Sequence, residues 1–148
     1  MKKIIFSAGI IFLAGFSAVF ANDGPAMVSK QVLESFKDKF SGASEVSWKE
    51  ERELDVATFR FDGLIFFAYF DKQGEWVATA RNILSSQLPI PLLMQLKKDY
   101  LGFWISALME VDSQSGTSYY ITVENSSKTL LLRSTGYNDW AVNIKFKK

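Results

Sequence analysis

The sequence predicts an α+β protein in which a helix packed on an antiparallel sheet occurs twice in tandem, as two α-β-β-β(β) units. The spacing of apolar residues predicts this fold class, because it changes from helical to strand-like twice along the chain. The spacing of aromatic residues agrees with a repeat, since 19 positions separate Phe40 from Phe59 and Tyr100 from Tyr119. We therefore expect two repeats in one domain, at about residues 26–82 and 88–147.

An amphipathic helix and a meander of strands account for the first repeat. Apolar residues recur at steps of three and four from Val28 to Phe40, with charged residues between them, and Gly42 follows the last turn as a helix stop. Alternation with period two then predicts strands around residues 46–49, 56–61 and 76–81, and the continuous apolar run at 64–70 predicts one more. Asp62-Gly63 predicts a tight hairpin turn, because both central residues of such a turn adopt positive φ.

The second repeat starts at Pro89 and Pro91, which introduce a helical pattern that extends to Tyr100. Strand-like stretches follow at about residues 105–111, 117–124, 129–134 and 140–146. The last of them alternates most regularly, and we expect its apolar side chains to face one way. These are Trp140, Val142, Ile144 and Phe146.

The first 21 residues have the three parts of a secretory signal peptide. Lys2 and Lys3 form a basic start, an apolar run follows, and Val19-Phe20-Ala21 places small residues where signal peptidase cleaves. Cleavage after Ala21 would leave residues 22–148 as a single domain region in the periplasm or outside the cell. It would also remove two lysines, which changes the formal net charge from +1 to −1. We expect no membrane insertion after cleavage.

Composition excludes several mechanisms. The chain has no histidine and no cysteine, so it offers no imidazole base, no cysteine nucleophile, no usual zinc site and no disulfide. We expect no cofactor and no metal. The lysines are scattered and the charge is near zero, which argues against nucleic acid as a partner.

Glu51 and Glu53 are the strongest candidates for acid-base chemistry, since alternation would place both carboxylates on one face of a strand. No other chemical group converges on them in the sequence pattern, and a solvated strand end explains them better. We therefore do not expect an enzyme.

Several motifs resemble a known family. They are Val46-Ser-Trp48 in the first strand, Asp71-x-x-Gly74-x-Trp76 at a hairpin, and Leu88-Pro89 at the second helix. With the helix that ends in an aromatic residue, they look like the PepSY-like, β-lactamase-inhibitor-like (BLIP-like) domains of secreted Bacteroidetes proteins. The resemblance implies a helix and antiparallel sheet in an exported protein of largely uncharacterised function. It does not imply inhibition of β-lactamase, because no motif here corresponds to the contact residues of those inhibitors.

The strand Leu64–Phe70 is apolar on both faces, so a single helix can cover only one of them. The other face needs cover from elsewhere in the chain, from a partner, or from a ligand. Tyr119-Tyr120 poses the same question, because adjacent strand residues face opposite ways. The candidate binding residues are Ile65, Phe67, Tyr69 and Tyr120.

Aromatic residues in surplus and the lack of catalytic residue types favour a non-catalytic binding or inhibitor-like module. We expect it to engage a protein or peptide of the cell envelope through a sheet face, and a second copy of the chain is another partner to consider. The alternative is a small apolar-ligand carrier with a pocket between helix and sheet.

Overall fold

The computed structural model describes residues 27–148, and the predicted signal peptide lies outside this range. Two helices, α1 (Lys30–Lys39) and α2 (Ile90–Asp99), accompany eight strands, and a short 3₁₀ turn, η1 (Ser85–Gln87), precedes α2. The strands are β1 (Ser44–Glu51), β2 (Leu54–Phe61), β3 (Leu64–Phe70), β4 (Trp76–Asn82), β5 (Trp104–Ser113), β6 (Gly116–Glu124), β7 (Lys128–Thr135) and β8 (Ala141–Lys147).

All eight strands form one antiparallel sheet in the order of the chain, from β1 to β8. The prediction of a tandem repeat of separate helix-on-sheet units is therefore wrong. The reason lies in the pairing of β4 with β5, which runs from Ala78 opposite Ser113 to Asn82 opposite Met109. Because these two strands share backbone hydrogen bonds, the strands before and after α2 belong to a continuous sheet.

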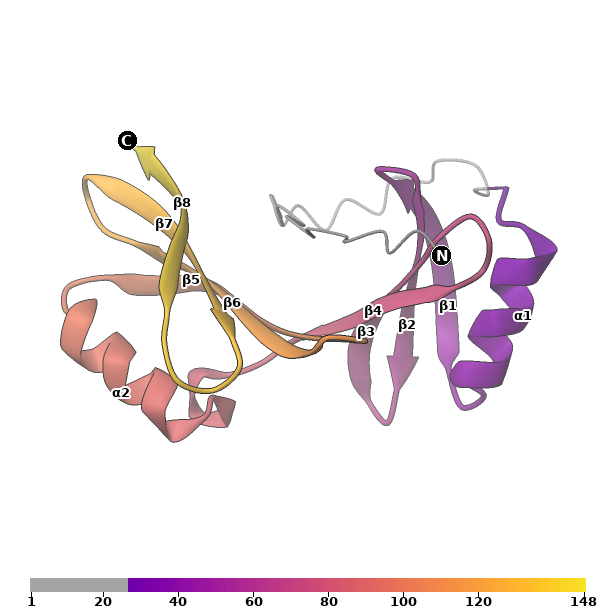
Figure 1. The fold of residues 1–148 in the computed structure, drawn as a ribbon, viewed down its shortest axis with the longest axis horizontal. Coiled ribbons are helices and arrows are strands. Elements are labelled where there is room, and N and C mark those ends of the chain that lie inside the picture. Colours follow the sequence, from indigo (N-terminus) through magenta and orange to yellow (C-terminus); the bar gives the residue numbers. More distant parts are fainter. Residues whose placement is uncertain (1–26) are drawn as a thin grey trace, which may run out of the picture.

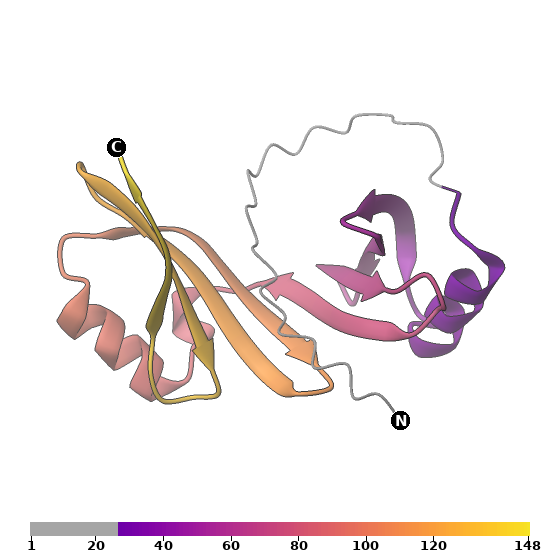
Figure 2. The same ribbon diagram turned by 45° about the horizontal axis from the view of Figure 1, so that its top comes forward.

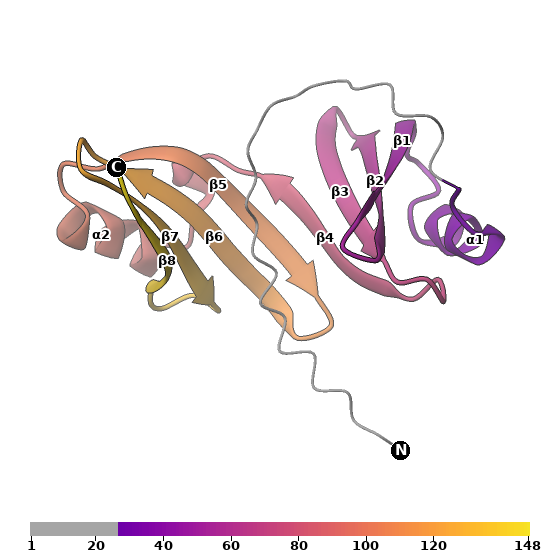
Figure 3. The same cartoon turned by 90° about the horizontal axis from the view of Figure 1, so that it is seen from above.

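The two helices lie at opposite ends of the molecule, with β4, β5 and β6 crossing between them (Figures 1, 2 and 3). Residues paired directly across neighbouring strands project to the same face of a sheet. Direct pairs connect Ala68 on β3 to Thr79 on β4, Thr79 to Asp112 on β5, and Asp112 to Thr117 on β6, so all four side chains project to one face. Ala68 packs near α1. Thr117 shares its face with Ile121, which packs near α2. Both helices thus cover the same face, and we call the opposite one the helix-free face.

Aromatic rings fill the space between α1 and the sheet. Ser29 caps the helix by accepting a hydrogen bond from the Val32 amide at 3.3 Å, and Val32 and Phe36 are buried. The centre of the Phe36 ring lies 5.1 Å from the ring centre of Phe59 and 5.2 Å from that of Trp48, both in edge-on geometry. These distances are typical of favourable aromatic pairs.

The core beneath α2 is largely aliphatic. Leu92 and Leu96 are buried against residues of β5, β6 and β7. Trp140, which precedes β8, is hydrogen-bonded to α2, since its indole Nε1 donates to the Leu92 carbonyl at 2.9 Å. Its backbone amide also donates to the Gln95 side chain at 2.7 Å. Trp140 is therefore a core residue, as its sequence pattern indicates.

The expected single apolar face of β8 is wrong. Val142 pairs with Leu132, but Ile144 pairs with Leu131, so Asn143 forms a bulge. A bulge changes the face to which the following residues project. Val142 thus lies on the helix-covered face, whereas Ile144 and Phe146 lie on the helix-free face. Val142 and Phe146 are 55% and 44% exposed.

Candidate functional site

The helix-free face carries a compact apolar group in the middle of the sheet. Tyr69 of β3 pairs with Ala78 of β4, and Met109 of β5 pairs with Tyr120 of β6, so their side chains project to the same face. We call this group the central cluster. Its buried members are Val56, Tyr69, Ala78, Ala80, Met109, Val111 and Tyr120. The cluster spans the β4–β5 pairing, which makes it part of what joins the two ends of the sheet.

The structure brings three of the four predicted site residues together. Tyr69 and Tyr120 are 5% and 6% exposed in the central cluster, and Phe67 is half-buried and packs against it. Ile65 lies on the same face but near the β2–β3 turn, where it is 48% exposed. The other side of β3 is accounted for by the core, because Phe66, Ala68 and Phe70 pack under α1.

Burial raises the pKa of the two phenols in the central cluster. It raises the pKa of Tyr69 above the ordinary value, and the negative charge of Glu51 adds to the effect. Burial also raises the pKa of Tyr120, although the Arg133 guanidinium works against this shift. Both pKa shifts follow from the burial of the two rings in the central cluster, where Tyr69 and Tyr120 contribute packing rather than exposed surface.

Exposed aromatic side chains extend the helix-free face beyond the central cluster. Trp104 pairs with Glu124, which follows Tyr120 at even spacing on β6, and Phe146 continues the same register through Thr129. Trp104 is 52% exposed. The helix-free face thus presents apolar side chains from Ile65 at one end to Trp104 and Phe146 at the other.

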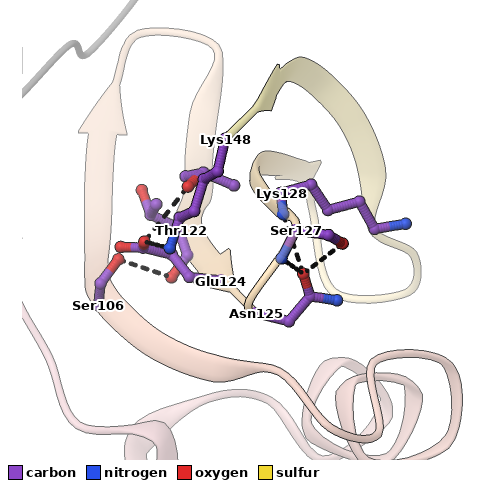
Figure 4. A network of polar contacts seen from close by, with 8 residues as sticks. Ser106, Thr122, Glu124, Asn125, Ser127, Lys128 and Lys148 are labelled. Carbon is purple, nitrogen blue, oxygen red and sulfur yellow. Dashed lines mark hydrogen bonds and ion pairs between the residues drawn. The ribbon is translucent and has the colours of Figure 1, made fainter.

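Polar contacts hold this aromatic end in place (Figure 4). The Lys148 ammonium forms an ion pair with Glu124 at 2.9 Å and lies 4.9 Å from the centre of the Trp104 ring. The hydrogen bond from Lys148 lowers the pKa of the Glu124 carboxyl group. Nearby, the Asn125 side-chain oxygen accepts hydrogen bonds from the backbone amides of Ser127 and Lys128, both at 3.0 Å, which closes the β6–β7 turn.

The opposite side of the central strands is polar. Between the helices, Arg81 of β4 donates to Glu110 of β5 at 2.8 Å, and both side chains are partly buried. Tyr119 lies beside Glu110 on the same face. Burial, with the negative charge of Glu110, raises the pKa of Tyr119 to about 12. The middle of the sheet is thus polar on the helix-covered face and apolar on the helix-free face.

Glu51 and Glu53 do not form the acid-base pair that strand alternation would have made. β1 ends at Glu51, which pairs with Lys49 at 3.0 Å. Glu53 lies in the following turn with a φ of 66°, so the alternation that would align the two carboxylates stops between them. Within residues 27–148, no three acidic, histidine or cysteine side chains gather as a metal site.

Sequence reasoning missed several residues of this face. Met109 and Val111 alternate with Leu108 and Glu110, a period-two signal that could have placed them opposite the helix. Arg133 was also missed, although it is a charged residue directly after three leucines.

None of the helices within residues 27–148 has the length and apolar character needed to cross a membrane.

The fold is that of known bacterial proteins. At 14% sequence identity, a protein from Bacteroides eggerthii described as a "putative periplasmic protein" superposes with a TM-score of 0.72, over 82% of this chain and 90% of that one. A DUF2874 family protein from Bacteroides uniformis has a TM-score of 0.71 at 16% identity, covering 80% and 88% of the two chains. A BLIP-like protein from Bacteroides fragilis has a TM-score of 0.69 at 18% identity, covering 84% and 89%.

These likenesses confirm the resemblance in fold that the sequence motifs indicate. At such low identity they establish the architecture alone, because one fold can carry many functions. No protein-family model and no curated protein matches the sequence.

Proposed function

We propose that this protein is an exported, non-catalytic binding module that engages a protein or peptide of the cell envelope through its helix-free face. The observation that carries the proposal is the pair of apolar groups that flank the buried central cluster on that face: Ile65 and the half-buried Phe67 at one end, and the exposed Trp104 and Phe146 at the other. Exposed aromatic side chains grouped beside a buried cluster are typical of binding surfaces.

The location of the fold's relatives supports the export part of the proposal. One of the similar structures is described as periplasmic, and the leader pattern of residues 1–21 points the same way. We propose cleavage after Ala21, which intact-mass measurement of the exported protein tests directly. A mass that still includes Met1 to Ala21 would contradict it.

The packing under α1 argues against the alternative, a carrier with an apolar pocket between helix and sheet. Phe70 is fully buried there, with its ring 6.3 Å from Phe36 and 6.2 Å from Trp48. Rings at these separations leave little room for a ligand between them. The helix-free face is therefore the better candidate for recognition.

Photo-crosslinking in cells tests the proposed surface. A photoreactive phenylalanine analogue is placed at Phe67 or Ile65 on the helix-free face, and at Leu33 on α1 as a control of similar exposure. We expect the first two positions to give the same crosslinked partner and the control to give none. Crosslinks that are equally strong from α1, or absent from both test positions, would contradict the proposal.

A further inference from the structure

Arg133 on β7 is a cation of the helix-free face that has no carboxylate partner among residues 27–148. It pairs directly with Tyr120 on one side and with Ala141 on the other. Its guanidinium carbon lies 5.5 Å from the centre of the Tyr120 ring. Among residues 27–148, the ion pairs leave Arg133 out, and its buried Nε has no hydrogen-bond acceptor.

The other cations on this face differ from Arg133. Arg60, opposite Ile65, donates to Glu45 at 3.2 Å, and Lys148 is paired with Glu124. A buried Nε without an acceptor is costly to keep, because this nitrogen has lost water and gained no hydrogen bond. An incoming carboxylate would supply that acceptor, and arginine binds carboxylates with two parallel hydrogen bonds.

Arg133 also lines a surface hollow of about 510 Å³. Asn138 and Asn143 line it as well, and their side-chain amides are hydrogen-bond donors for an oxygen ligand. Asp139 contributes a carboxylate to the wall, but it does not lie within ion-pair distance of Arg133. The hollow thus provides space for a ligand beside Arg133, whose guanidinium carbon lies 5.5 Å from the centre of the Tyr120 ring in the central cluster.

We propose that Arg133 anchors a carboxylate-binding subsite of the helix-free face. The subsite takes an acidic side chain or the C-terminal carboxylate of a bound peptide segment, while a neighbouring apolar side chain of that segment packs near Tyr120. This inference rests on the proposed function, since it names the chemistry of the partner that the same face recognises.

Short peptides that differ by one charge test the subsite in the purified exported protein. The probes are N-acetyl-Phe-Asp-amide, N-acetyl-Phe-Ala with a free carboxylate, and N-acetyl-Phe-Asn-amide as the neutral isostere. Titrations are followed by ¹⁵N–¹H NMR at the amides of Tyr120, Arg133 and Asn143. We expect one or both charged peptides to bind at least about 10-fold more tightly than the neutral one, and the better of the two identifies the source of the carboxylate.

Variants at Arg133 separate recognition from folding. Arg133→Gln is expected to remove the preference for charge, and Arg133→Lys to keep part of it, because lysine retains the charge but not the planar pair of donors. Arg60→Gln is the matched control on the same face and should bind like the unaltered protein. Dispersed NMR spectra of each variant establish that it is folded.

Three results would overturn the subsite. They are equal affinity for charged and neutral peptides, tight binding of a charged peptide by folded Arg133→Gln, and the absence of any titration by the charged peptides. If all peptides shift the amides of Phe67 and Tyr69 regardless of charge, the subsite fails while the binding face stands. The crosslinking experiment at Phe67 decides the binding face independently.

Discussion

Replacing Phe36 by alanine tests whether the continuous sheet behaves as one cooperative unit. Phe36 is 7% exposed, and its ring contacts Phe40, Trp48, Phe59 and Phe70 at centroid distances of 5.4, 5.2, 5.1 and 6.3 Å. Truncating such a ring leaves a cavity and removes several aromatic contacts at once. The change therefore disturbs the core under α1 at its centre and leaves the core under α2 untouched.

We expect Phe36→Ala to lower the free energy of unfolding by about 3 to 5 kcal/mol, the usual range for a buried phenylalanine. With a urea m value of about 2 kcal/mol/M, the unfolding midpoint would fall by roughly 1.5 to 2.5 M. Leu33→Ala is the control on the same helix. Since Leu33 is 42% exposed, its loss should cost less than about 1 kcal/mol.

The assay combines urea unfolding with hydrogen exchange measured by mass spectrometry. In one cooperative sheet, fragments from β2–β3 and from β6–β7 should lose protection by the same free energy in Phe36→Ala. A sheet that opens in two independent parts would lose protection in β2–β3 alone. That result, or a destabilisation below about 1 kcal/mol, would refute the reasoning from the β4–β5 pairing and the central cluster.

The remaining predictions concern polar groups. The pKa of Tyr119 is raised to about 12, so the folded protein keeps this proton at pH values where the unfolded chain, with a tyrosine pKa near 10, has lost it. The free energy of unfolding should therefore fall between pH 10 and 12. Titration followed by phenolate absorbance should show a tyrosine with a high pKa. Asp55→Asn should cost about 1 to 3 kcal/mol in urea unfolding, because the Asp55 side chain is 3% exposed and pairs with Lys72 at 2.8 Å; no measurable loss would show that the pair contributes nothing. A double-mutant cycle of Arg81→Met and Glu110→Gln should give a coupling of about 1 kcal/mol, and a value as small as that of an exposed pair on α1 would refute a role in joining β4 to β5.

Local elements of this fold could be predicted from sequence because their signals are local. The strand predicted at residues 64–70 is found at Leu64–Phe70, and the turn before it has positive φ at Asp62 and Gly63, 49° and 78°. Apolar periodicity and turn chemistry decide such features within a few residues. The division of β3 into a face under α1 and a face away from it also followed from alternation.

The arrangement of the strands in one sheet could not be predicted in the same way. β4 and β5 are separated along the chain by η1 and α2, and their pairing depends on tertiary contacts rather than on a turn between them. A bulge such as that at Asn143 leaves the alternation of apolar letters intact while changing the face of Ile144. The sequence pattern therefore predicts one apolar face for β8, whereas the structure divides these residues between the two faces of the sheet.

The candidate site was partly accessible to sequence reasoning. The second apolar face of Leu64–Phe70 and the adjacent Tyr119-Tyr120 led to the prediction of Phe67, Tyr69 and Tyr120, which the structure groups on the helix-free face. Their part in binding stays a prediction. Arg133 has only a weak sequence signal, a charge directly after three leucines, because its significance depends on the absence of an ion pair among the described residues, which is a property of three-dimensional proximity.

The irregular pairing at both edges of the sheet bears on the tendency of the protein to aggregate at high concentration. β1 and β8 are the border strands, and each is paired to its neighbour with a register shift, between Ser44 and Ser47 and between Leu131 and Leu132. An unpaired border is a template for another chain, and a bent, charged border is a poor one. Lys145 and Lys147 make two β8 borders repel each other. The bulge that turns Phe146 onto the helix-free face thus also makes the β8 border a poor template for the addition of a further strand.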